Sequence, residues 1–364
     1  MNQSQDKIEC LKKNAAHVRV LRLDYHYGNV HPLGEWPRES PVFELIDLLP
    51  GLREFCLLEC VAFTWEGRCG LVGRLLARCP RLEKLSLWII DFGPCPPTAA
   101  YLVWADYKLY TARQYRLKAL DIYVLPGSRQ SHERGEYIFK PFLNIFSNAT
   151  SSLEEFGFNL EGSETTDMTA EEPSLNGLDP DGVDLASRPL SMPSLKFLDI
   201  DALCYFDNLS QFMTLDSFAK VTWLSILVNI RVLYPGVASV TAFKKDASEL
   251  IEVLQHFPNL TYLWINMGDT INIDVWPQTG ETIPQEFWDA WAEQLPVFCS
   301  VVPRLKNIRG QTDECGKDFI VLRSDDAGIV VKEAEMATKP DLVDAPNIFG
   351  FQENWYYWRK VVLT

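Results

Sequence analysis

The sequence repeats one short apolar phrase, and this repeat constrains the fold more than any other feature. The phrase is an apolar residue, two variable residues, an apolar residue, one variable residue and a third apolar residue. Four copies follow a Pro-x pair, at residues 52–57, 82–87, 195–200 and 260–265. Five weaker copies lie at residues 18–23, 117–122, 153–158, 221–226 and 305–310. A unit that recurs in this way buries its apolar face only by stacking against its neighbours.

Segments with the helical spacing of apolar residues precede most copies, at residues 42–49, 71–77, 247–257 and 287–302. The copies begin about 36 residues apart on average, which exceeds the roughly 20–29 residues of a standard leucine-rich repeat. Helices and strands that alternate in one order produce parallel strands. We therefore predict an α/β fold of irregular long repeats: a leucine-rich-repeat-like solenoid, or horseshoe, with parallel strands on the concave face and helices on the convex face. An ordinary doubly wound α/β sheet is the alternative.

The predicted solenoid spans residues 18–312, between an N-terminal cap segment at 1–17 and a C-terminal cap at 313–364. Within the C-terminal cap, apolar runs at 319–322 and 329–332 predict strands, and the aromatic cluster at 355–358 is expected to cover the last apolar edge. A ligand-contact role for that cluster is the alternative. The apolar periodicity stops between residues 161 and 191. This stretch contains eight acidic residues and one basic residue, so we predict a disordered acidic insertion there.

Charge and cysteine usage exclude several partners and compartments. The net charge of −15 argues against nucleic acid and against an anionic membrane surface. There is no apolar run of about 18 residues and no signal-peptide pattern at the start, so we expect a cytoplasmic or nuclear protein. The nine cysteines include no C-x-x-C pair, which predicts reduced, mostly buried thiols and not a zinc site.

Catalytic signatures are missing from the sequence. The nucleophile-elbow, phosphate-binding-loop, zinc-protease and dinucleotide-binding patterns do not occur, and the five histidines lack the spacing of metal ligands. We therefore expect a protein that is not an enzyme, with no catalytic residues, no cofactor and no metal. Asp199 and Asp201 share one strand face and could act as a carboxylate pair, but alternate outward positions of any repeat strand look similar.

Two copies resemble a known family. The Cys79-Pro-Arg-Leu82 stretch and the phrase that ends at Cys60 are similar to the cysteine-containing repeats of F-box-associated leucine-rich-repeat proteins, which are abundant in fungi. The resemblance covers the repeat region, from about residue 14 to residue 312. It implies recognition of substrates for a cullin-based ubiquitin ligase, whose adaptor subunit binds the F-box of the family. No F-box phrase of the Leu-Pro-x-Glu type is seen ahead of Val18.

The variable positions of the phrases predict the surface that binds a partner. Alternate strand residues point to opposite faces, so these positions should line the concave face. The candidate protein-binding residues are Trp88, Asp121, Tyr123, Asp199, Asp201, Trp264 and Asn266. Aromatic residues anchor protein interfaces, and the acids favour a protein with a basic surface. The alternative is that neighbouring loops cover Trp88 and Trp264.

These observations lead to one functional hypothesis and one alternative. We expect non-enzymatic protein–protein recognition through the concave face, with substrate recognition for a cullin-based ubiquitin ligase as its specific form. The adaptor of that ligase would be a second partner if an F-box belongs to the protein. The alternative is a stand-alone structural or inhibitory repeat scaffold with no link to a ligase.

Overall fold

The protein is an α/β structure. The computed structural model describes residues 10, 12–24, 46–60, 72, 74–90, 116–125, 149–160, 190–201, 213–227, 250–266, 285–311, 316–324 and 328–333. The chain forms two compact units, one of residues Met1–Ser194 with Ser210–Thr214, the other of residues Leu195–Leu209 with Leu215–Thr364. Most of the predicted acidic insertion (161–189) and the aromatic cluster at 355–358 lie outside the described residues.

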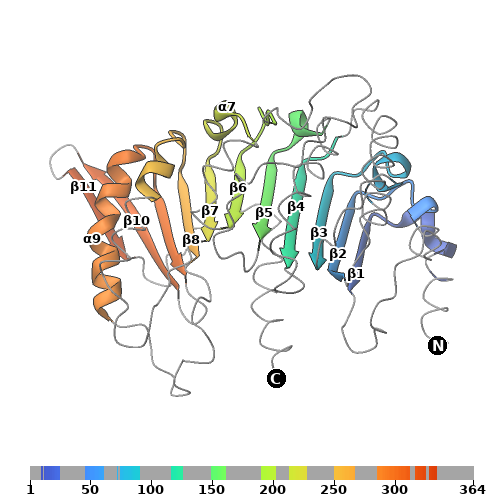
Figure 1. The fold of residues 1–364 in the computed structure, drawn as a ribbon, viewed down its shortest axis with the longest axis horizontal. Helices are drawn as coiled ribbons and strands as arrows, with labels where there is room; N and C mark the ends of the chain where they lie inside the picture. Colours follow the sequence, from blue (N-terminus) through green and yellow to red (C-terminus); the bar gives the residue numbers. More distant parts are fainter. Residues whose placement is uncertain are drawn as a thin grey trace, which may run out of the picture. The chain divides into compact units, whose positions relative to one another are not determined.

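The first unit contains five parallel strands that lie side by side in chain order (Figure 1). Short 3-10 helices η1 and η3 immediately precede the first and the last of these strands. The elements are η1 (Ala15–His17), β1 (Val20–Asp24), β2 (Glu54–Cys60), β3 (Lys84–Ile90), β4 (Ala119–Leu125), η3 (Thr150–Ser152) and β5 (Glu155–Leu160).

The second unit continues the same order of elements and then reverses its last strands. Strands β6 to β9 are parallel neighbours in chain order, whereas β10 pairs antiparallel with both β9 and β11. The elements are β6 (Phe197–Asp201), α7 (Leu215–Phe218), β7 (Trp223–Leu227), β8 (Tyr262–Asn266), α9 (Gln285–Val301), β9 (Asn307–Gln311), β10 (Gly316–Ser324) and β11 (Gly328–Glu333). The α/β class, the mostly parallel order and the two strands predicted near the C-terminus are therefore confirmed.

The apolar positions of the repeated phrase form the core. In the copy that begins at Leu52, the three apolar side chains are 0–1% exposed, and those of the copy that begins at Leu260 are equally buried. The first copy is the exception, since Val18 is half-buried. Leucine, isoleucine and phenylalanine at these positions each contribute roughly 1.5–3 kcal/mol when fully removed from water. The repeated phrase thus supplies a large share of the apolar burial in both units.

The Pro-x pair before the phrase forms a tight turn that links the preceding segment to the strand. The N–H of Leu52 donates to the carbonyl of Leu49 at 3.0 Å, with Pro50 as the second residue of the turn. Proline suits this position because its ring fixes φ near the value that the turn requires. The same hydrogen bond recurs at Leu82, Leu260 and Leu305, each behind a proline. The same hydrogen bond also forms without a proline at Val18, Leu153 and Val221, so the proline favours this geometry but is not required for it.

One carbonyl per repeat joins each parallel strand to the next. The carbonyl oxygen just before a strand accepts hydrogen bonds from two consecutive N–H groups at the start of the following strand. Arg19 accepts from Arg53 and Glu54, at 2.7 and 3.0 Å. The same arrangement recurs between the other parallel neighbours of each unit, with Arg53, Glu83, Lys118, Lys196, Thr222 and Thr261 as acceptors. Equivalent positions of successive phrases consequently lie side by side.

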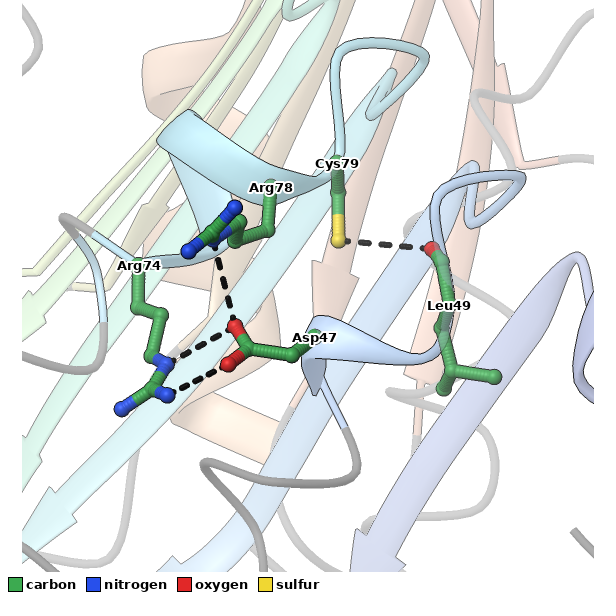
Figure 2. Close-up of polar contacts among 5 residues, drawn as sticks. All are labelled: Asp47, Leu49, Arg74, Arg78 and Cys79. Carbon is green, nitrogen blue, oxygen red and sulfur yellow. Dashed lines mark hydrogen bonds and ion pairs between the residues drawn. The ribbon is translucent and has the colours of Figure 1, made fainter. Parts of the chain in front are cut away.

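A carboxylate links two consecutive repeats in the helical layer of the first unit. Asp47 accepts hydrogen bonds from Nε and Nη2 of Arg74, at 2.9 and 2.5 Å, and Nε of Arg78 lies 3.4 Å from its Oδ1 (Figure 2). The hydrogen bonds from Arg74 lower the pKa of Asp47, against the opposing effect of burial. Beside this ion pair, the Cys79 thiol donates to the carbonyl of Leu49 at 3.5 Å.

The described cysteines agree with the prediction of mostly buried thiols. Cys56, Cys79 and Cys299 are buried, while Cys10 is exposed, and no disulfide joins these four. Burial raises the pKa of Cys79 and of Cys299 to about 11. Because the thiolate is the reactive form, these two thiols are inert at neutral pH and serve as small apolar residues.

Removal of a phrase leucine should destabilise the first unit far more than removal of an exposed leucine nearby. Leu85 is 1% exposed and Leu48 is 41% exposed. We expect Leu85→Ala to lower the free energy of unfolding by about 2–5 kcal/mol, and Leu48→Ala by about 0.5 kcal/mol or less. Urea denaturation followed by circular dichroism measures both values. Equal losses would contradict the assignment of the phrase to the core.

Loss of the Asp47–Arg74 ion pair should have a small, pH-dependent effect. Both side chains are about one-third exposed, so we expect Arg74→Gln to cost about 0.5–1 kcal/mol at pH 7. The lowered pKa means that this contribution is complete above the ordinary value of 3.8 and is lost as the pH falls through the lowered pKa. Urea denaturation at pH 7 and pH 3 checks the effect, with the exposed Arg81→Gln as the control. A loss at pH 3 as large as that at pH 7 would refute the linkage.

Candidate functional site

Each parallel sheet has a second face, formed by the residues that alternate with the buried phrase positions, and we call it the variable face. The register aligns its residues in rows that cross the strands. The first row is Val20, Glu54, Lys84, Ala119 and Glu155 in the first unit, and Phe197, Trp223, Tyr262 and Asn307 in the second. The second row is Arg22, Cys56, Ser86, Asp121 and Gly157 in the first unit, and Asp199, Ser225, Trp264 and Arg309 in the second.

The variable face of the first unit carries charged and polar residues beside a few apolar ones, Val20, Cys56 and Ala119. Its first row carries Glu54, Lys84 and Glu155, all half-buried. Its second row runs from the exposed Arg22 to the half-buried Asp121 and ends at a glycine. A helix layer packed here would need apolar side chains, as on the opposite face. This face is therefore suited to polar contacts.

Asp121 sits in a space that a glycine leaves open. Its Oδ2 accepts a hydrogen bond of 3.0 Å from the Ser86 hydroxyl. Its Oδ1 lies 2.6 Å from the position that a Cβ would have at residue 157 on the neighbouring strand. Any larger residue at Gly157 would therefore displace the carboxylate. Burial raises the pKa of Asp121 to about 6, and the hydrogen bond from Ser86 opposes that shift.

The variable face of the second unit is aromatic. The Trp223 ring lies over Tyr262, with centroids 4.0 Å apart, and meets the edge of Phe197 at 6.1 Å. Trp223 is half-buried, whereas Phe197 and Tyr262 are buried with Trp264 in the same cluster. Such ring pairs contribute about 0.5–1.5 kcal/mol beyond their burial. This cluster is thus a packed element of the sheet as well as a surface feature.

An arginine from the last parallel strand lies on this aromatic cluster. The Arg309 guanidinium carbon is 5.2 Å from the centre of the Trp264 ring. A cation over an indole face is attracted by the negative face of the ring. Trp264 is 8% exposed. Its burial favours the alternative in which this tryptophan is covered, and a binding role for it stays a prediction.

The structure places the predicted binding residues on four strands. In the first unit Trp88 on β3 pairs in register with Tyr123 on β4, two residues after Asp121. In the second unit, strand β7 separates Asp199 and Asp201 on β6 from Trp264 and Asn266 on β8. The register thus brings only the Trp88 and Tyr123 positions together as direct neighbours. The side chains of Trp88, Tyr123, Asp201 and Asn266 lie outside the described part of the structure.

Four residues of the variable face were missed by the sequence prediction. Three of them are aromatic residues at the third position of their phrases, two residues before the fifth position, which the sequence prediction used: Phe197, Trp223 and Tyr262. The signal that could have identified them is an aromatic residue at this same position in three consecutive copies. Arg309 was missed because its copy of the phrase ends in a glycine and was not included in the predicted face.

Neither a metal-binding cluster nor a membrane-spanning helix occurs among the described residues. No group of three or more histidine, cysteine, aspartate and glutamate residues there is arranged to hold a metal ion. In the same part of the chain, no helix has both the length and the apolar character needed to span a membrane.

Comparison with known proteins gave matches among solved structures. No protein-family model and no curated protein matches the chain. Among solved structures, the chain is similar to one described as the crystal structure of the Rad7 and Elc1 complex in yeast. The two chains are 14% identical, the comparison covers 83% of this chain and 81% of that one, and the TM-score is 0.27. At this score, nothing known of that complex transfers to this chain.

A side chain at residue 157 should disturb Asp121 specifically. We expect Gly157→Ala to displace the carboxylate from the Ser86 hydroxyl and to lower the free energy of unfolding by about 1–2 kcal/mol. In an Asp121→Ala background the obstacle is absent, and alanine is otherwise favoured over glycine in a strand. The double-mutant cycle, measured by urea denaturation, should show coupling of at least about 0.5 kcal/mol. Additive effects would contradict the contact.

Proposed function

We propose that this protein is a leucine-rich-repeat-like horseshoe that recognises another protein through its variable face and does not catalyse a reaction. One observation supports this most strongly. The rows of the variable face include charged side chains in the first unit and aromatic side chains in the second. A second helix layer packed on this face would instead require rows of aliphatic side chains. Aromatic residues and buried charged pairs supply most of the binding energy in protein interfaces.

The partner that fits this face has a basic surface. The chain carries a net charge of −15. On the variable face of the first unit, Glu54, Asp121 and Glu155 are half-buried and therefore poorly screened by solvent. A basic protein would be steered towards such a surface and would find complementary charges on it.

The specific form of this function that we propose is the substrate receptor of a cullin-based ubiquitin ligase, acting in the cytoplasm or the nucleus. It is supported by the similarity of the repeat region to F-box-associated leucine-rich-repeat proteins. The cysteine of the Cys79-Pro-Arg-Leu82 stretch is buried, and its thiol donates to Leu49 of the preceding repeat. This contact gives the cysteine of that repeat subtype a structural role between repeats.

A photocrosslinking experiment in the native cells tests the proposal. A benzophenone amino acid is placed at Lys84 on the variable face or, as the control, at the exposed Glu252 in the helical segment 250–254. We expect the Lys84 position to give a discrete crosslinked adduct with a protein partner, because a bound partner covers that row. The Glu252 position should give none. Mass spectrometry of the adduct identifies the partner.

The result separates the general proposal from its specific form. Recovery of a cullin and its adaptor together with the crosslinked partner supports the ligase receptor. A stable partner without those subunits supports a scaffold instead. If Lys84 and Glu252 give the same adducts, or if neither gives one, recognition through the variable face is wrong.

A further inference from the structure

We propose that Asp121 is the binding site for one lysine or arginine side chain of the protein partner. The Ser86 hydroxyl hydrogen-bonds its carboxylate, which lies beside Gly157. The inference rests on the proposed function, because it assigns a specific contact within the variable face. It also assigns a role to Ser86 and Gly157, neither of which would contact the partner as an anchor. Ser86 orients the carboxylate, and Gly157 provides the space in which it lies.

Within the part of the chain that the structure describes, the carboxylate keeps acceptor sites for a ligand. An ionised carboxylate has about four acceptor sites, and the Ser86 hydroxyl occupies one of them. Among the described residues, no lysine, arginine or histidine forms an ion pair with Asp121. The side chain is half-buried. An oriented carboxylate of this kind matches the donors of a lysine or arginine side chain.

The electrostatics of the surrounding strands leave Asp121 without a local counter-charge. The nearest charged group on this face is Lys84 on β3 and Glu155 on β5. Each lies one row away from Asp121, and their opposite charges offset each other there. Further along, β2 carries Glu54 and the neutral Cys56, and β1 carries Arg22 at the far end of the row. Burial disfavours the ionised carboxyl and raises its pKa to about 6, and a bound cation would offset that penalty.

The second unit shows that a guanidinium fits on this kind of face. There the second row ends with Arg309, which lies over Trp264. In the first unit the same row ends with Gly157. No neighbouring described strand places an arginine or lysine beside Asp121 in that row. A divalent metal is a poorer occupant, since Ca²⁺ requires about six to eight oxygen ligands and this row offers one carboxylate and one hydroxyl. A basic side chain of the partner fits the available groups.

The assignment carries a defined pH dependence. Below a pH of about 6 the carboxyl of free Asp121 becomes protonated and neutral, so it no longer attracts a cation. Binding of a basic side chain favours the ionised form and lowers the pKa of Asp121, which means that binding releases a proton near pH 6. Affinity should therefore decrease as the pH falls through this range.

Selection from a displayed library of random 12-residue peptides tests the assignment on the full chain. We expect the peptides that bind to carry a lysine or arginine that their binding requires. For a synthetic arginine peptide, Asp121→Asn should weaken binding about tenfold or more, because asparagine keeps the size and the Ser86 hydrogen bond but loses the charge. Wild-type affinity should also fall about tenfold between pH 7.5 and pH 5, while Asp121→Asn shows little change.

A change in the peptide provides a control that leaves the protein fold untouched. Citrulline in place of arginine should weaken binding to the wild type by the same factor and should have no added effect on Asp121→Asn. Glu252→Gln, which removes an exposed acid from a helical segment, should bind like the wild type. If peptides bind the Lys84→Glu variant differently but bind Asp121→Asn like the wild type, Asp121 is not the binding site. Recognition through the variable face would then still hold. Failure of any peptide to depend on the variable face would overturn both.

Discussion

The arrangement of side chains in this protein depends on one carbonyl oxygen in each repeat that accepts two N–H groups from the next. Because the acceptor stands at the same place in the parallel pairs of each unit, the register of those pairs is set at the strand entry. A shift of a single residue would exchange the apolar and variable faces of the whole strand. The same hydrogen bonds therefore determine both the core and the candidate recognition surface.

The two faces of the sheet share this backbone but respond differently to change. The phrase positions tolerate only apolar residues of similar volume, because they are close-packed. The variable positions are less uniform, and neighbouring repeats carry residues as different as Ser86, Asp121 and Gly157 side by side. A partner surface can thus be assembled from several repeats without loss of the core, since each repeat supplies one or two side chains to a row.

The fold was predictable from the sequence because its determinants are local. The spacing of Leu82, Leu85 and Leu87, with Pro80 ahead of them, is enough to indicate a turn and a half-buried strand, and repetition indicates parallel stacking. The site was less predictable, because it depends on neighbours that are distant in the chain. Nothing near Asp121 in the sequence indicates that Gly157 would make room for it. The burial of Trp264 likewise depends on packing, which the strand pattern alone does not describe.

The reversal of strand direction after β9 has a consequence for how such a chain can change in length. The carbonyl of Lys306 stands where a further repeat would attach, but it accepts the N–H of Val321 from the antiparallel β10. Nearby, Nη2 of Arg323 donates to the carbonyls of Cys299 and Val302 at the end of α9. The position at which another parallel strand would pair with β9 is therefore occupied by β10. Additional repeats in this unit would have to be inserted ahead of β9. Duplication at this terminus would produce a separate domain instead of a longer array.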